Sequence, residues 1–150
     1  MALITLEELA KTSGPLLGID PGTRTFGLSL SDTTRLIASP LETIRRRKFT
    51  PDAVRIFELY DRHKCAAIVV GLPLNMDGSH GPRAQSVQDF CTNLLSIRDV
   101  PILMWDERLS TAAVTRAMIA DDTSRARRAK VVDELASAYI LQGVLDRLRA

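Results

Sequence analysis

The sequence has 150 residues, of which 45% are hydrophobic and 25% are charged, and its formal net charge is +2 at pH 7. This size and balance are typical of one globular domain with a core of its own, so we expect no second domain. No apolar run reaches the roughly 18 residues that span a bilayer, and no signal-peptide pattern opens the chain, so we expect a soluble, cytoplasmic protein without a membrane partner.

The cysteines and histidines do not form a metal-ligand pattern. Cys65 and Cys91 lie far apart in apolar-rich segments, and we expect both to be reduced core residues. His63 and His80 are isolated from each other and from the cysteines. A transition-metal site is therefore not expected.

Positive charge is clustered in two short runs of the sequence. One run covers residues 45–48, and the other consists of Arg125, Arg127, Arg128 and Lys130. The net charge alone is too small to indicate nucleic-acid binding, although its clustering is informative. Either run taken alone is more typical of a solvated surface.

In chain order, the first part of the sequence predicts a short helix, a hairpin, a third strand and a second helix. The short helix follows Thr5 and ends at residues 13–15, and we assign residues 1–15 to an N-terminal extension of a domain that covers 16–150. The other predicted elements are strands at 16–20, 26–30 and 37–44 and a helix capped by Thr50 that ends near His63.

The second part of the sequence predicts a parallel crossover followed by helices. Residues 66–70 and 101–105 are apolar runs typical of buried strands, and a helical pattern lies between them at 84–95. Strand, helix and strand in this order imply parallel pairing. We expect Ser110 to cap a further helix, residues 121–130 to form a mobile basic loop, and a last helix to follow.

Three acids stand at the ends of predicted elements. Asp20 follows the first strand, Glu107 follows the last strand, and Asp133 lies near the start of the final helix. In open α/β sheets the functional crevice lies outside the carboxyl ends of the parallel strands, so Asp20 and Glu107 would meet there if their strands are neighbours. Asp133 could complete the cluster from the flanking helix.

Carboxylates that cluster without His or Cys repel one another unless a cation neutralises them, and Mg²⁺ or Mn²⁺ prefers such oxygen ligands. Two such ions about 4 Å apart can activate water and stabilise the leaving oxygen of a phosphodiester. Each acid also has an ordinary structural role open to it. Asp20 could stabilise the turn at residues 21–22, Glu107 could pair with Arg108, and Asp133 could lie in the first turn of a helix.

Two loops offer weaker signals. The turn with Gly22, Thr23 and Gly27 could cradle a phosphate with backbone amides, but this pattern is short and weakly specific. The loop of residues 71–82 brings further polar groups near the same sheet edge, although an ordinary turn explains them slightly better. These groups are Asn75, Ser79 and His80.

Four segments, in this order, resemble the bacterial YqgF or RuvX proteins, a family described as Holliday junction resolvase-like nucleases of ribosomal RNA maturation. They are GIDPGTRTFGLSLSD at 18–32, VVGLPLNMDGSHGPRA at 69–84, DERLST at 106–111, and a basic run followed by VVDELASAYILQ at 131–142. The resemblance extends over nearly the full length of the chain.

The resemblance implies an α/β, RNase H-like fold with a mixed five-stranded sheet flanked by helices. It also implies an active site of Asp20, Glu107 and Asp133 that would bind Mg²⁺ or Mn²⁺. Arg108, Ser110 and Thr111 would support Glu107 or contact backbone phosphates. The run of Arg125, Arg127, Arg128 and Lys130 becomes a candidate nucleic-acid contact.

The leading expectation is metal-dependent hydrolysis of phosphodiester bonds in the 5′-end processing of pre-16S rRNA. The first alternative is a DNA endonuclease for four-way junctions, which normally needs a dimer for symmetric cuts. A non-catalytic nucleic-acid-binding protein and an ATP-binding actin-like module are further alternatives, although 150 residues leave no room for the two lobes of the latter. The sequence leaves open whether the protein is a monomer or a homodimer.

Overall fold

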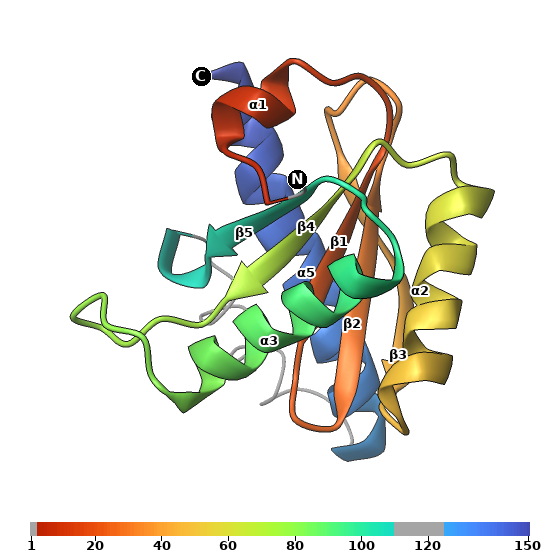
Figure 1. Ribbon diagram of the computed structural model, residues 1–150, viewed down its shortest axis with the longest axis vertical. Coiled ribbons are helices and arrows are strands. Elements are labelled where there is room, and N and C mark those ends of the chain that lie inside the picture. Colours follow the sequence, from red (N-terminus) through yellow and green to blue (C-terminus); the bar gives the residue numbers. More distant parts are fainter. Residues whose placement is uncertain (1–2, 110–124) are drawn as a thin grey trace.

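The computed structural model describes residues 3–109 and 125–150, without the side chains of residues 109, 125–132 and 134. The chain forms a central sheet with helices on both faces (Figure 1). The strands are β1 (Leu16–Pro21), β2 (Thr25–Ser31), β3 (Ala38–Arg45), β4 (Ala67–Leu72) and β5 (Ile102–Asp106). The helices are α1 (Leu6–Ala10), α2 (Phe49–Arg62), α3 (Pro82–Ile97), the short 3₁₀ helix η1 (Glu107–Leu109) and α5 (Arg125–Arg149). Among the described residues, no helix has both the length and the apolar character needed to cross a bilayer.

The sheet has five strands in the order β3-β2-β1-β4-β5. β1 pairs antiparallel with β2, and β2 pairs antiparallel with β3, as expected for hairpins. β1 and β4 are parallel, as are β4 and β5, and α3 makes the crossover between the last two. The mixed five-stranded sheet and the parallel crossover are therefore confirmed. The order also places β4 between β1 and β5.

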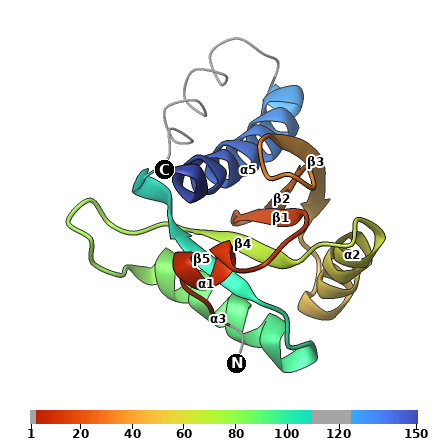
Figure 2. The same ribbon diagram turned by 90° about the horizontal axis from the view of Figure 1, so that it is seen from above.

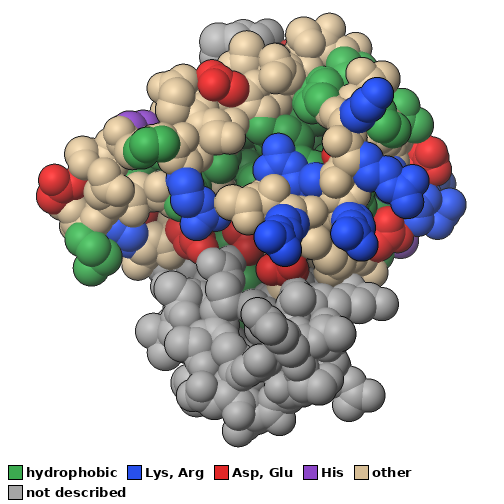
Figure 3. Space-filling view, turned by 90° about the horizontal axis from the view of Figure 1, so that it is seen from below, with side chains coloured by type: hydrophobic (Ala, Val, Ile, Leu, Met, Phe, Trp, Pro, Cys, Tyr) green, Lys and Arg blue, Asp and Glu red, His purple; other side chains and the backbone are tan. Residues whose placement is uncertain are grey.

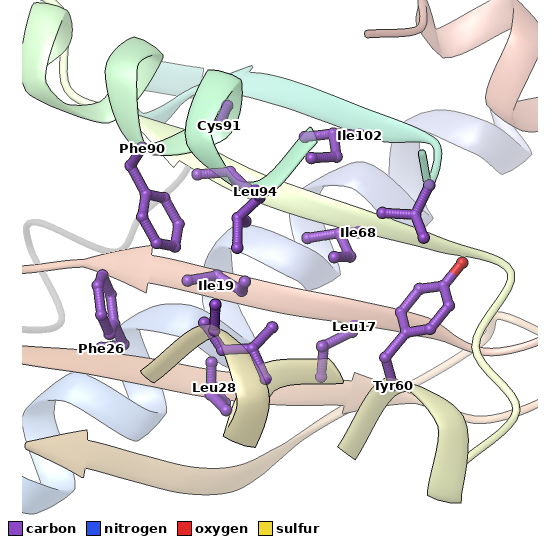
Figure 4. Close-up of a cluster of buried hydrophobic side chains, with 14 of the residues drawn as sticks. Leu17, Ile19, Phe26, Leu28, Tyr60, Ile68, Phe90, Cys91, Leu94 and Ile102 are labelled. Carbon is purple, nitrogen blue, oxygen red and sulfur yellow. The ribbon is translucent and has the colours of Figure 1, made fainter. Parts of the chain in front are cut away.

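The molecule has three layers, with α2 and α3 on one face of the sheet and α5 on the other (Figure 2). Under α2 and α3, aliphatic and aromatic side chains form the larger core, in which the Phe26 and Phe90 rings stack with centroids 4.8 Å apart (Figure 4). Under α5 lies a second cluster that includes Leu16, Leu141 and Leu145. Burial on both faces explains why β1 and β4 lack alternation of apolar and polar residues.

Small residues let α5 pack directly on the hairpin of β1 and β2. A Cβ atom on Gly27 would lie 2.1 Å from the backbone oxygen of Asp133, and one on Gly18 would lie 3.2 Å from the Cβ of Leu141. Between these two points, the buried hydroxyls of Ser29 and Ser137 are hydrogen bonded at 2.8 Å. The helix axis is thus held close to the sheet at the level of Asp133.

The N-terminal helix is tied to the edge of the sheet. Thr5 and Glu8 form a capping box at its start, as the sequence predicts for Thr5. The side chain of Leu9 is fully buried, and the Ile4 backbone N–H donates to the Ile102 carbonyl at 2.9 Å. The division of the chain at residue 15 stays a prediction.

Two expected helix boundaries are wrong. α2 begins at Phe49, with Lys48 at the N-cap, so Thr50 lies inside the helix and does not cap it. The buried Asp52 carboxylate accepts a hydrogen bond from the Arg47 backbone N–H and stabilises this start of the helix. Residues 125–130, expected in a mobile loop, already belong to α5. The segment 125–130 consists of Arg, Ala and Lys, which have high helix propensity. It can therefore be helical although it lacks the apolar periodicity that predicts a helix. The helix expected after Ser110 lies outside the described residues.

Both cysteines are free; Cys91 is buried as expected, whereas Cys65 is only half-buried and packs against the edge of the core. Burial raises the pKa of the Cys91 thiol to about 12 and that of Cys65 to about 11. Neither thiol is therefore a nucleophile near neutral pH.

Candidate active site

Asp20 lies at the carboxyl end of β1, on the face covered by α5. Alternation along the strand puts Ile19 into the core under α2 and α3, and Gly18 and Asp20 on the opposite face. Asp20 is only 7% exposed, and its Oδ1 lies 3.8 Å from where a Cβ on Gly71 would be. The carboxylate therefore lies beside the neighbouring strand β4 at a point where that strand carries no side chain.

The packing of α5 brings Asp133 to the same place. Asp20 pairs with Gly27 in the register of β1 and β2, and the Asp133 backbone rests on Gly27. The Thr25 hydroxyl donates a hydrogen bond to Oδ2 of Asp133. Asp20 and Asp133 line one hollow, which we call the acid hollow. Asp133 lies in the third turn of α5, so the alternative of an acid in the first turn of a helix is wrong.

Glu107 ends up one strand further along the sheet. It is the first residue of η1, directly after β5, and β4 separates it from Asp20. The condition that the strands of Asp20 and Glu107 are neighbours is not met, and their axes are about 10 Å apart. Within residues 3–109 and the described part of α5, no three Asp, Glu, His or Cys side chains form a group that could hold a metal ion. The structure thus brings together Asp20 and Asp133, but not all three acids.

The donor set of the acid hollow fits a hard divalent cation. Mg²⁺ is commonly held by one or two carboxylates, with substrate phosphates and water as its other ligands. Asp20 and Asp133 supply two carboxylates, and Gly71 leaves space beside the first of them. A softer metal, which prefers His or Cys, has no such ligands in this hollow.

Arginines surround the acid hollow. Arg24, Arg45 and Arg83 line it together with the two acids, and Arg45 is placed there because it pairs with Thr25 in the register of β2 and β3. Figure 3 shows Lys and Arg side chains gathered on this lower face of the molecule, next to acidic ones. Residues 45–48 are exposed, as expected of a solvated run, and the run begins at the wall of the site. Charge clustering was the only sequence signal for this placement.

Arg108, which follows the end of β5, uses its guanidinium group in hydrogen bonds within the protein. It donates to both carboxylate oxygens of Asp106, at 3.1 and 2.7 Å, and also to the backbone carbonyl of Met76 at 3.1 Å. Its hydrogen bonds hold the pKa of the Asp106 carboxyl below the ordinary value. Arg108 thus ties the end of β5 to the loop of residues 73–81, and its role beside Glu107 stays a prediction. Ser110 and Thr111 lie outside the described residues, as do the side chains of Arg125, Arg127, Arg128 and Lys130.

The two weaker loop signals have structural explanations. The Gly22 N–H donates to the Thr25 carbonyl at 2.8 Å and closes the hairpin, and Gly27 is covered by α5, so neither forms a phosphate cradle. In the other loop, Asn75 donates to the Ser79 hydroxyl at 3.0 Å. His80 is hydrogen bonded to Gln88, also at 3.0 Å. These polar groups stabilise the loop and the start of α3.

Comparison with known proteins places the chain in a family. Residues 14–147 match the family model described as "RuvX: Holliday junction resolvase". A relative from Beijerinckia indica is 60% identical over 149 residues, which cover 97% of this chain and 90% of the relative. A relative from Methylocella silvestris is 55% identical over 150 residues, covering 98% and 93%. Both relatives are named as candidate pre-16S rRNA nucleases.

Solved structures agree on the fold. RuvC from Thermus thermophilus, in complex with a Holliday junction substrate, superposes with a TM-score of 0.57 at 17% identity, over 91% of this chain and 97% of RuvC. Another RuvC structure from Thermus thermophilus gives a TM-score of 0.53 at 16% identity, over 90% and 96%. The expected RNase H-like fold is confirmed. Because the family model spans nearly the whole chain and both relatives share more than half of its residues, this protein belongs to the RuvX family.

Proposed function

We propose that this protein is a divalent-metal-dependent nuclease that hydrolyses phosphodiester bonds in pre-16S rRNA. The observation that carries the proposal is the convergence of Asp20 and Asp133 in a hollow that arginines also line. Carboxylates suit the metal, and guanidinium groups suit the phosphates of the substrate. The names of the relatives supply the substrate class.

In the proposed mechanism, Asp20 and Asp133 hold Mg²⁺ or Mn²⁺, and Glu107 is the third acid, facing the substrate from the end of β5. A metal ion held there would supply Lewis acidity toward the scissile phosphate and toward a water nucleophile. Thr25 orients the Asp133 carboxylate through its hydroxyl. Arg45 and Arg83 attract and position the phosphodiester by charge and by their forked hydrogen-bond donors. Burial of Asp20 limits the water around its carboxylate and strengthens these electrostatic interactions.

The test is cleavage of a labelled pre-16S rRNA fragment by the wild type and by Asp20→Asn, with Mn²⁺ or with EDTA. We expect EDTA to abolish cleavage and Asp20→Asn to lower the rate by more than about 100-fold, since even groups that only orient metal ligands contribute ten- to hundredfold. Asp89→Asn is the matched control, because Asp89 is an exposed acid on α3. Full activity of folded Asp20→Asn would reject the proposed site.

A second candidate function is cleavage of four-way DNA junctions, which the description of the family model favours. The same assay with a labelled junction in place of the RNA compares the two substrates. If neither substrate is cut but both bind, the protein is a non-catalytic nucleic-acid-binding protein. ATP binding by an actin-like module is disfavoured, since Gly27 packs against α5 and forms no phosphate loop.

A further inference from the structure

A second hollow adjoins the acid hollow, and its described lining residues include arginines but no acids. Arg46, Arg47 and Arg83 line it together with Ser86, and we call it the arginine hollow. The turn of residues 21–23 and Arg83 line both hollows. The two spaces are therefore neighbours that share the turn of residues 21–23 as a wall.

Arg46 is exposed, and two contacts with the hairpin of β1 and β2 restrain its side chain. Its guanidinium carbon lies 4.5 Å from the centroid of the Phe26 ring, and its Nη1 donates to the Gly22 carbonyl at 2.6 Å. Phe26 is buried and stacks on Phe90 of α3. A cation that packing holds in place loses less entropy when it binds an anion than a freely moving side chain does.

No described carboxylate forms an ion pair with an arginine of this hollow. The ion pairs between described residues involve Arg55, Arg98, Arg108 and Arg149, and none of them involves Arg46, Arg47 or Arg83. Three guanidinium groups around one concave space repel one another and favour an anion between them. The guanidinium fork matches the geometry of phosphate oxygens and can bind them through two parallel hydrogen bonds.

We propose that the arginine hollow binds the phosphodiester adjacent to the one held in the acid hollow, so that the substrate strand crosses the hairpin tip of residues 21–23. This inference rests on the proposed function of the acid hollow. Arg83, which lines both spaces, lies between the two phosphates. Arg46 and Arg47 bind the adjacent phosphate from the side of β3. The contacts are to the backbone, so they fix the register of the strand without reading its bases.

The first test measures binding without cleavage. All proteins carry Asp20→Asn and are kept in EDTA, and the probe is a fluorescein-labelled single-stranded RNA from the pre-16S leader. The double variant Arg47→Gln/Arg83→Gln removes two exposed charges and leaves Arg46, which supports the hairpin turn, in place. We expect Kd to rise at least tenfold. The slope of log Kd against log salt should fall by about 0.7 to 1.4, at about 0.7 for each phosphate that the variant no longer neutralises.

The matched control is Arg62→Gln/Lys64→Gln, which removes the same charge from exposed residues at and just after the end of α2, outside both hollows. We expect this control to keep the Kd and the salt slope of the parent protein. Equal losses in the two double variants would mean that only net charge matters and would overturn the proposal. An unchanged Kd for Arg47→Gln/Arg83→Gln would overturn it as well.

The second test locates the bound phosphate. Oligonucleotides with a single neutral methylphosphonate at successive positions are bound by the parent and by Arg47→Gln/Arg83→Gln. One position, next to the bond that the wild type cleaves, should weaken binding by the parent and have a clearly smaller effect in the double variant, in which only Arg46 remains to contact that phosphate. Loss of this coupling would reject the adjacent-phosphate site alone. Absence of metal-dependent cleavage by the wild type would instead reject the proposed nuclease, while the binding result would still stand.

Discussion

At the scale of the residue, the hydroxyl of Thr25 joins two parts of the site that are 108 residues apart in sequence. It donates to the carboxylate of Asp133 and so restricts rotation of that carboxylate about its side-chain bonds. A carboxylate that already points toward its metal loses less entropy on binding, and groups that orient ligands typically contribute ten- to hundredfold to metal affinity.

We therefore expect Thr25→Val to raise the Mg²⁺ concentration for half-maximal cleavage by about 10- to 100-fold. Valine keeps the shape of threonine but has no hydroxyl to donate to Asp133. The measurement is the cleavage rate of the pre-16S fragment as a function of Mg²⁺ concentration, with denaturant unfolding as a check on stability.

Thr25→Ser is the matched control for this prediction. Serine keeps the hydroxyl, so its half-saturating Mg²⁺ concentration should stay within a few-fold of the wild type. If Thr25→Val and Thr25→Ser behaved alike, the hydrogen bond to Asp133 would have no part in metal binding.

At the scale of the element, the site depends on how closely α5 approaches the hairpin. Gly27 has no side chain at the point where the Asp133 backbone crosses it. This lets α5 come close to the sheet next to Asp20, which pairs with Gly27. The contact on the helix side is a backbone carbonyl, which cannot move aside as a flexible side chain can. The packing contact of the Asp133 backbone on Gly27 thus helps to set where the two acids lie relative to each other.

Gly27→Ala should destabilise the protein by about 3 kcal/mol, the upper part of the range for overpacked cores. Its Cβ would lie 2.1 Å from the Asp133 oxygen, so α5 must shift outward. A shift of about 1 Å in a catalytic group can lower the rate about 100-fold. Urea unfolding measures the first effect, and metal-dependent cleavage under conditions where the variant is folded measures the second.

Ser29→Ala provides the comparison on the same strand. It removes one hydroxyl of the pair with Ser137 and leaves the partner without its bond, at a cost of about 1 kcal/mol. It does not push the helix away, so cleavage should stay within a few-fold of the wild type. Suppose that Gly27→Ala were less stable than the wild type but cleaved as fast as Ser29→Ala. The distance between α5 and the sheet would then not control the activity of the site.

The sequence predicted elements better than it predicted how they come together. The strands β1, β2 and β4 follow from apolar runs and turn residues, and the positions of Asp20 and Glu107 at strand ends follow with them. The strand order does not follow, because a one-dimensional pattern does not say that β4 inserts between β1 and β5. The role of Gly27 was missed for the same reason, since the residue it contacts is far away in sequence.

At the scale of the whole molecule, both edges of the sheet are protected against pairing with another chain. At one edge, residues 3–4 pair with Ile102 of β5. At the other, β3 contains Pro40, which has no N–H to donate, and its pairing with β2 is interrupted between Leu28 and Ser29. Proline and irregular pairing at an edge strand discourage the addition of a further strand. A continuous sheet across two copies of the protein is therefore disfavoured.

We expect the protein to be a monomer, with a mass by light scattering close to its 16.5 kDa chain mass. Its activity on a four-way junction should then consist of single, uncoupled nicks, because one copy presents one acid hollow and symmetric paired cuts need two. A supercoiled cruciform plasmid distinguishes the two modes: uncoupled nicking gives open circles first, whereas paired incision gives linear product directly. A mass near twice that of the chain together with direct linear product would contradict this prediction and favour junction resolution. A monomer that cleaves the pre-16S fragment faster than the junction would favour the processing role, since a single-strand cut needs only one site.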